Sequence, residues 1–268
     1  MTYAQLSHSV SKAMSMLTQE ISWRWPVRIL AAAAIFTFGV WLIGFDYTVP
    51  QFQADPDHTG QIEPIDWQWW RQAADWLHGR KYIALTFDDG PSDHATDTTI
   101  LQILAKHRAH AIFFTICDRS ESPQQIADLR ADLASGNAIG DHTLTHKHLL
   151  KISWAEDVKQ VCGCQKHLEE LIGRPVRWFR PPYGETSYAI QALAHANGME
   201  ELLWGDNSLD TWLRNERQID YWTVTTASNY TVVLMHSLPT TAVALDRTLT
   251  DLERLGYRFV LPKPHGKI

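Results

Sequence analysis

The stretch KYIALTFDDG, at residues 81–90, decides how the rest of the chain is interpreted. Its first seven residues are rich in β-branched, aromatic and aliphatic side chains, and such a continuous run is typical of a strand buried on both faces of a parallel sheet. The run ends abruptly at Asp88, Asp89 and Gly90. The sequence therefore predicts a strand over residues 81–87 that carries two adjacent carboxylates at its carboxyl end.

Downstream of this strand, strand-like and helix-like segments alternate to the end of the chain. Further strands are expected at residues 109–117, 176–179, 201–204, 231–235 and 257–260, with helices near 100–104 and at 124–135, 155–172, 186–197, 215–227 and 241–255. Gly173 follows the third of these helices, as glycine often does at a helix C-terminus. The alternation predicts an α/β fold with a parallel sheet, either open and doubly wound or closed into a barrel.

Ionisable residues follow four of the expected strands. They are Asp88 and Asp89, Arg180, the pair Asp206 and Asp210, and His236. In parallel α/β folds the catalytic groups gather at the carboxyl ends of the strands. We therefore expect these side chains to form one site.

The stretch DHTLTHKHLL, at residues 141–150, supplies a second pattern. His142 and His146 are four residues apart, and on a helical turn they share a face and can bind one metal ion. One aspartate oxygen and two histidine nitrogens make a three-ligand site with a position left open, which is the arrangement of catalytic zinc. His148 and His94 lie near these residues and are expected to face substrate or solvent.

Four motifs, taken together, resemble the polysaccharide deacetylase family, which shares the NodB homology domain. They are TFDDGP from residue 86, HTLTH from 142, RPPYG from 180 and LMH from 234. The resemblance covers roughly residues 81–260. It implies a distorted parallel (β/α) barrel with fewer than eight full strands, and hydrolysis of N-acetyl groups with the help of a divalent metal. Zinc is the first candidate, and Co²⁺, Ni²⁺ and Mn²⁺ are the alternatives.

The resemblance also implies a role for each motif residue. It makes Asp88 the general base, oriented by Arg180; Asp89, His142 and His146 the metal ligands; Tyr183 a backbone donor to the oxyanion; Leu234 a wall of the acetyl pocket; and His236 the general acid, tuned by Asp210. These roles suit amide hydrolysis, which needs an activated water, an oxyanion stabiliser and an acid for the leaving amine.

The fourth motif of the family is altered in this chain. In the string WGDNSLDTW, at residues 204–212, Asp210 fits the second acidic position, but Thr211 follows it where family members have a tryptophan. Trp212 comes one place late, and Asn207 stands where an aspartate is expected. Trp212 remains a candidate substrate-binding residue, although the wall of the sugar site is changed.

The N-terminal region contains the uncharged run ILAAAAIFTFGVWLIGF, at residues 29–45. Its 17 residues are enough for a short transmembrane helix, and interfacial aromatic residues bracket or cap it, namely Trp23, Trp25, Trp41 and Tyr47. Three basic residues and one acidic residue precede it, whereas five acidic residues and no basic one follow it before Arg71. The positive-inside rule places residues 1–28 in the cytoplasm and the remainder outside. A buried core helix and a cleaved signal peptide are the alternatives.

The predicted organisation is therefore a cytoplasmic segment at 1–28, a signal anchor at 29–45, a linker with an amphipathic helix at 46–80, and a catalytic domain at 81–268. The helix is indicated by apolar residues at helical spacing from Ile62 to Trp76. We expect this helix to pack on the domain. The alternative is that Trp67 and Trp70, which lie off its apolar face, contact the membrane interface. The predicted location is the cytoplasmic membrane, crossed once, with the catalytic domain on the extracytoplasmic side.

The amino-acid composition excludes some classes of binding partner and of fold. The net charge of −6 lacks the basic surface of a nucleic-acid binder, and 45% hydrophobic residues argue against long disorder. Three cysteines cannot form a disulfide framework, and Cys117, at a strand end, is interpreted as a small buried hydrophobe. Cys162 and Cys164 do not share a helix face and make a poor metal site. The predicted partners are an N-acetylated glycan and the membrane, and the oligomeric state is not predicted.

Three functions fit the sequence. The first is an N-deacetylase acting on an amino-sugar polymer such as peptidoglycan or an exported polysaccharide. The second is an O-acetyl esterase, whose alkoxide leaving group needs an acid less than an amine does. The third is a non-catalytic carbohydrate-binding protein on the same fold. Such a protein is expected to have lost one of five residues, and none of them is lost here: Asp88, Asp89, His142, His146 and His236.

Overall fold

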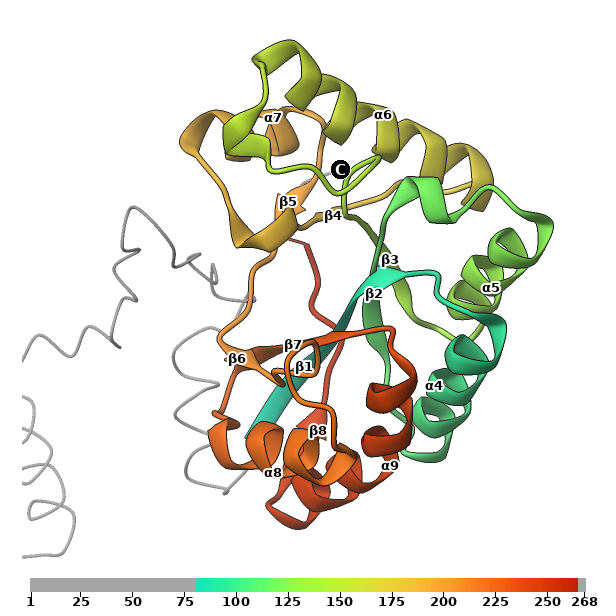
Figure 1. Cartoon of the computed structure of the whole chain (residues 1–268), viewed down its shortest axis with the longest axis vertical. Helices are drawn as coiled ribbons and strands as arrows, with labels where there is room; N and C mark the ends of the chain where they lie inside the picture. The colour runs from blue at the N-terminus through green and yellow to red at the C-terminus, as the bar shows by residue number, and fades with distance from the viewer. Residues whose placement is uncertain (1–80, 265–268) are drawn as a thin grey trace, which may run out of the picture. The chain divides into compact units, whose positions relative to one another are not determined.

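The computed structural model describes residues 81–264, which form a curled sheet of eight parallel strands (Figure 1). The strand order is β5-β4-β3-β2-β1-β7-β6, and β8 pairs with the start of β1. The strands are β1 (Lys81–Gly90), β2 (Ala111–Thr115), β3 (Ala138–Asp141), β4 (Trp178–Phe179), β5 (Glu200–Glu201), β6 (Asp206–Asn207), β7 (Thr231–His236) and β8 (Tyr257–Phe259). Because β5 and β6 stand at opposite edges of this sheet of residues 81–264 and do not pair with each other, the sheet is a half-barrel rather than a closed barrel.

Six long helices cover the outside of this sheet. They are α4 (His94–Lys106), α5 (Pro123–Ala134), α6 (Trp154–Ile172), α7 (Tyr188–Ala196), α8 (Glu216–Thr226) and α9 (Pro239–Arg254). Local sequence sets several of their ends. Ser122 and Gln125 form a capping box at the start of α5, and Gly173 ends α6 with a φ of 67°, which glycine adopts without a steric penalty.

Strand β1 has one face toward the helices and one toward the inside of the half-barrel. Ile83, Leu85 and Phe87 belong to the main apolar core, and Phe87 stacks on Phe113 at 5.2 Å between ring centroids. Ala84 belongs to a smaller inner cluster. Burying each large apolar side chain contributes about 1.5–3 kcal/mol. This two-sided burial explains the continuous apolar run of β1, and it leaves Asp88 on the inner face.

The parallel α/β fold predicted from the sequence is confirmed, and most expected elements lie within a few residues of the observed ones. Strand β3 was not predicted, because AIGD is short and contains glycine. The strand expected at 201–204 is wrong in extent: β5 ends at Glu201, β6 begins at Asp206, and the two lie at opposite edges of the sheet. The predicted anchor at 29–45, the helix within 46–80 and the domain boundaries before residue 81 lie outside the described residues.

The cysteines correct one interpretation. Cys117 forms a disulfide with Cys164 of α6, so it is more than a small hydrophobe, and Cys162 is a free thiol. Sequence spacing could not reveal this pair because the two residues are 47 positions apart and meet only in the folded chain. Within residues 81–264, no helix combines the length and apolar character needed to cross a membrane.

Candidate functional site

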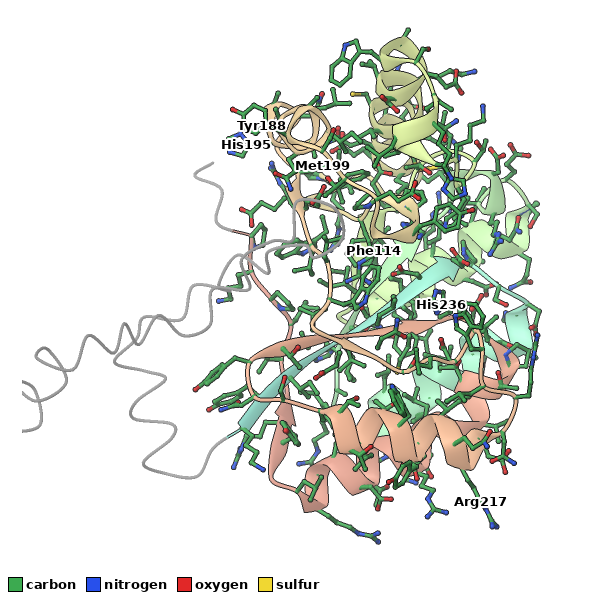
Figure 2. All side chains as sticks on the ribbon, turned by 60° about the vertical axis from the view of Figure 1, so that its left-hand side comes forward. Phe114, Tyr188, His195, Met199, Arg217 and His236 are labelled. Atoms are coloured by element: carbon green, nitrogen blue, oxygen red, sulfur yellow. A yellow bond between two sulfur atoms is a disulfide. The ribbon has the colours of Figure 1, made fainter. Side chains whose placement is uncertain are left out.

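Polar side chains gather at the carboxyl ends of β1, β3, β4 and β7. Asp88 and His236 are register partners in the β1–β7 pairing. Arg180 directly follows β4, and its backbone N–H donates to the carbonyl of Asp141 on β3. Figure 2 shows His236 beside the strands, whereas Arg217 of α8 lies at the far end of the domain. Four strands that are distant in sequence thus deliver their terminal residues to one place.

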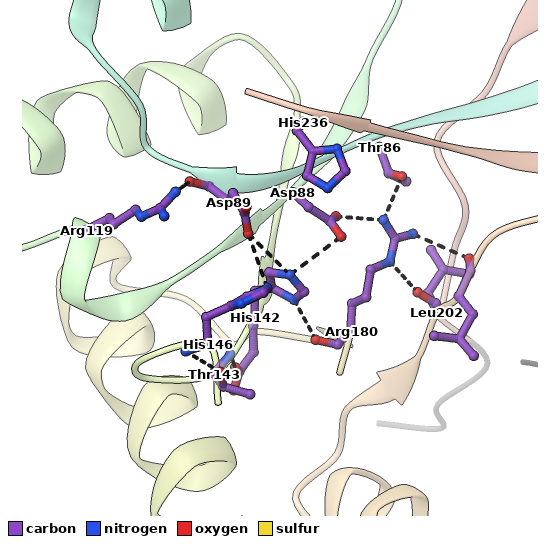
Figure 3. Close-up of polar contacts among 12 residues, drawn as sticks. Thr86, Asp88, Asp89, Arg119, His142, Thr143, His146, Arg180, Leu202 and His236 are labelled. Atoms are coloured by element: carbon purple, nitrogen blue, oxygen red, sulfur yellow. Dashed lines mark hydrogen bonds and ion pairs between the residues drawn. The ribbon is translucent and has the colours of Figure 1, made fainter. Parts of the chain in front are cut away.

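Asp88 and Arg180 form a buried ion pair (Figure 3). The Arg180 Nη1 donates to Asp88 Oδ1 at 2.7 Å and to Thr86 Oγ1 at 2.8 Å, and its Nε donates to the carbonyl of Leu202 at 2.7 Å. Removing one partner of such a pair leaves a buried charge alone and costs about 3–5 kcal/mol. The network therefore holds the Asp88 carboxylate in one orientation.

The fold makes room for the Arg180 guanidinium on the inner face. The guanidinium lies over the ring of Phe114 at 4.1 Å. A side chain at Gly140 on β3 would come within 2.5 Å of the Phe114 ring, so this close approach requires glycine. The short strand that sequence reasoning missed is therefore needed to seat the arginine.

Asp89 reaches the site through an irregularity in β1. Neighbouring residues of a strand point to opposite faces, so Asp88 and Asp89 should diverge. The β1–β2 register shifts between Asp88 and Gly90, and Asp89 has a φ of 67°. Such a bulge inserts an unpaired residue and redirects its side chain. Both carboxylates consequently face the same site.

Asp89, His142 and His146 are the group among residues 81–264 that could hold a metal ion, with their ligand atoms within 4.8 Å of one another. The Asp89 Oδ1 lies 3.6 Å from His142 Nε2 and 3.4 Å from His146 Nε2 (Figure 3). The helical turn expected for the two histidines is wrong. They lie on an irregular loop in which Thr143 and His146 have positive φ, and Thr143 Oγ1 accepts the backbone N–H of His146.

The donor set fits a divalent metal. Asp89 Oδ1 is buried and has no hydrogen-bond partner, which is costly unless a cation completes it. His142 Nδ1 donates to the carbonyl of Arg180 at 2.7 Å, so its Nε2 carries the lone pair and faces the cluster. Burial, followed by the charge of His142, lowers the pKa of His146 to about 4 against the opposing effect of Asp89 and Asp88. His146 is thus neutral near pH 7, as a metal ligand must be.

His236 and Asp210 form a second buried pair on the other side of the site. The His236 Nδ1 donates to Asp210 Oδ1 at 2.8 Å, and Asp210 Oδ2 accepts the His236 backbone N–H at 2.7 Å and the Thr241 hydroxyl at 2.6 Å. Burial alone lowers the pKa of His236, but the hydrogen bond and charge of Asp210, aided by Asp88 and Asp89, raise it above its usual value. The pair therefore favours the protonated imidazole.

The three remaining candidates differ in how closely they approach this network. Leu234 is buried on β7 and shares the inner face with His236. Tyr183 has a φ of 62°, and its ring meets that of His146 edge-on at 4.7 Å. Trp212 is 82% exposed and lies two residues after Asp210. Asp206 is directed elsewhere, because it accepts the backbone N–H of Ser228.

Sequence reasoning missed two hydroxyls that complete the network. Thr86 contacts Arg180, and Thr241 contacts Asp210. The alternation of β1 places Thr86 on the face of Asp88, so that contact could have been inferred. Thr241 lies in the first turn of α9, and no spacing pattern points to it. The two histidines that the sequence places near the ligand motifs contact carboxylates instead: His94 Nδ1 contacts Asp128, and His148 contacts Glu185.

Comparisons with known proteins agree with this geometry. A family model for polysaccharide deacetylase matches residues 78–202. The peptidoglycan-N-acetylglucosamine deacetylase PgdA of Listeria monocytogenes is 34% identical over 181 residues, which cover 67% of this chain and 38% of that protein. A peptidoglycan-N-acetylglucosamine deacetylase of Bacillus cereus is 30% identical over 193 residues, covering 67% of this chain and 68% of that protein.

Solved structures show the same likeness. The peptidoglycan deacetylase PdaC from Bacillus subtilis superposes with a TM-score of 0.61 at 32% identity, covering 67% of this chain and 87% of the solved chain. The full PdaC protein, like PgdA, is longer: the chain spans about two fifths of the length of either.

Proposed function

The chain belongs to the polysaccharide deacetylase family, and from this premise we propose that it removes N-acetyl groups from amino sugars of a cell-envelope or exported polysaccharide. Peptidoglycan is the first candidate, because the relatives described above are named peptidoglycan deacetylases. The observation that carries the proposal is the convergence of a three-ligand cluster, a buried Asp88–Arg180 pair and a buried His236–Asp210 pair at one end of the sheet.

Asp89, His142 and His146 would hold a divalent cation, with zinc as the first candidate for a site of one oxygen and two nitrogen ligands. When bound, the cation supplies Lewis acidity, which lowers the pKa of water and polarises the acetyl carbonyl. The remaining chemistry belongs to the protein. Asp88 accepts the proton of the attacking water while Arg180 holds its other oxygen at 2.7 Å. The backbone N–H of Tyr183 donates a hydrogen bond to the oxyanion.

The leaving amine requires a proton, and His236 is placed to donate it. Asp210 binds Nδ1, which leaves Nε2 as the ring nitrogen available to substrate. Leu234 lines the space for the acetyl methyl group, and Trp212 lies at the rim of the sugar site. An O-acetyl ester has a leaving group that needs this proton less, so the complete His236–Asp210 pair favours an amide substrate over an ester.

The test is acetate release from a panel of glycans. The purified full chain is incubated with peptidoglycan, an N-acetylglucosamine oligomer and an O-acetylated xylan, before and after metal depletion and readdition. Acetate from the N-acetylated substrates that disappears on depletion and returns with the metal supports the proposal. Release from the O-acetylated xylan alone would make the chain an esterase, and no release from any substrate would favour a binding protein.

We also propose that residues 29–45 anchor the chain once in the cytoplasmic membrane, with the catalytic domain outside. The uncharged run and its charge-asymmetric flanks support this topology. A reporter fused after Val49 should be active only outside the cytoplasm, and the full chain should stay with membranes after alkaline washing. Recovery of a shortened soluble form that begins near Asp46 would instead indicate a cleaved signal.

A further inference from the structure

His148 follows the metal-ligand loop but makes contacts of a different kind. Its ring lies flat on the ring of Tyr183, with centroids 3.9 Å apart and planes within 10°. Its Nδ1 donates to Glu185 Oε2 at 2.9 Å. The two partners lie on either side of Gly184, in the segment that follows Arg180. His148 thus connects the loop of His142 and His146 to the loop of Tyr183.

The backbone of Tyr183 needs such support. Its φ is 62° and its ψ is 4°, which is the left-handed region that residues with a Cβ atom rarely adopt. Gly184 follows with a φ of 70°. Non-glycine residues persist in this region only when surrounding contacts hold them there. For the Tyr183 ring those contacts are His148 against one face and His146 edge-on at 4.7 Å.

We propose that His148 and Glu185 are positioning residues for the oxyanion donor: they clamp the Tyr183 ring and thereby set the direction of its backbone N–H. This inference rests on the proposed deacetylase function. The ring is joined to the backbone nitrogen through one Cα atom, so a rotation of the ring or a relaxed φ moves the N–H away from the carbonyl oxygen. Donors of this kind act only within a narrow range of distance, about 2.7–3.1 Å from the oxyanion.

An alternative use of the same residues makes a different kinetic prediction. Tyr183 is 54% exposed, and an exposed aromatic surface can stack on a sugar ring. Loss of a sugar contact that is equal in the ground and transition states raises KM and leaves kcat unchanged. Loss of donor alignment lowers kcat and leaves KM nearly unchanged, because the oxyanion exists only in the transition state.

The experiment compares variants of this clamp on an N-acetylglucosamine tetramer. His148→Ala should lower kcat about 10- to 100-fold, since a small misplacement of a catalytic group can cost that much. KM and bound metal per chain should stay within twofold of the parent. His148→Phe keeps the stack and should recover part of the loss. Glu185→Gln keeps an acceptor for His148 and should remain near the parent, whereas Glu185→Ala should lose activity like His148→Phe.

Two controls make the result decisive. His94→Ala removes another histidine whose Nδ1 contacts a carboxylate, that of Asp128 at 2.7 Å, outside the site, and it should change none of these values. Asp88→Asn tests the proposed function itself. If Asp88→Asn is inactive while His148→Ala retains full kcat, or raises only KM, the clamp is overturned and the deacetylase is not. A fall in unfolding temperature with unchanged kcat would also overturn it, leaving His148 a purely structural role.

Discussion

The two halves of the site satisfy their polar atoms in opposite ways. The ligand half, made of Asp89, His142 and His146, leaves a buried carboxylate oxygen without a hydrogen bond and places two imidazole nitrogens 3.4–3.6 Å from it. The acid half, made of Asp210, His236 and Thr241, gives Asp210 three donors from the protein at 2.6–2.8 Å. The ligand half leaves one buried acceptor without a partner, and the Asp210 carboxylate of the acid half has all its partners within the protein.

This difference indicates which half should depend on solution conditions. Backbone irregularity is more frequent in the ligand half, where Asp89, Thr143 and His146 have positive φ, than in the acid half, where Leu209 beside Asp210 has one. The acid half instead joins the regular strand β7 to the first turn of α9 through Asp210. We therefore expect the ligand half to respond to metal and the acid half to respond to pH.

Substituting a residue of the ligand half should have the largest effect. Asp89→Ala, His142→Ala and His146→Ala should each lose bound metal and activity together, because three protein ligands leave no substitute. Metal content per chain and kcat on an N-acetylated oligomer measure both properties. Full occupancy and turnover in any one of these variants would remove that residue from the ligand set.

A smaller effect separates proton transfer from metal binding. Asp88→Asn and His236→Ala should keep the metal and lose kcat by about 10²–10⁴-fold, the usual contribution of a positioned base or acid. The His236→Ala loss should shrink on an activated acetyl ester, whose leaving group needs no proton, whereas the Asp88→Asn loss should not. If Asp88→Asn were metal-free while Asp89→Ala retained metal, the two aspartates would exchange roles.

The same comparison explains what the sequence could predict. Asp88, Arg180 and His236 lie at or directly after the carboxyl ends of strands, and a parallel sheet brings such ends together whatever the details of packing. The grouping of Asp89 with His142 and His146 was also predicted, from the family resemblance and from a helical turn for the two histidines that is wrong. What brings them to Asp89 is a bulge and two left-handed loop residues, and these have no periodic signature.

Other features could not be predicted because they depend on tertiary contact. The Cys117–Cys164 disulfide, the seat of Arg180 over Phe114 and the Thr241–Asp210 hydrogen bond join segments that the chain order keeps apart. Strand β3 has four residues and β6 has two, too few for alternation to be recognised. The sequence therefore predicts the site residues at strand ends, but it does not predict the loops that complete the site.

The pH response tests the acid half. Asp210 raises the pKa of His236 against the lowering effect of burial, so Asp210→Asn should let that pKa fall. Since His236 acts when protonated, the alkaline limb of the kcat profile should move to lower pH. Each pH unit of that shift means about tenfold less activity on the alkaline side. A limb that stays in place would remove Asp210 from this role, and metal content should match the parent.

The smallest expected effects come from a matched pair of threonines, one beside each buried ion pair. Thr241→Val removes a donor from Asp210, and Thr86→Val removes an acceptor from Arg180 together with a donor to the Val233 carbonyl, with little change of shape. Each lost bond to a charged group should lower the free energy of unfolding by about 1.5–3 kcal/mol and kcat by less than tenfold.

The two variants should differ in their pH profiles. With one donor fewer, Asp210 interacts more strongly with protonated His236, so Thr241→Val should move the alkaline limb slightly upward, opposite to Asp210→Asn. Thr86→Val acts on the Asp88–Arg180 pair and should leave that limb in place. Denaturant unfolding and kcat profiles across pH measure both effects. Equal limb shifts in the two variants would mean that the acid half is not electrostatically separate from the base beside it.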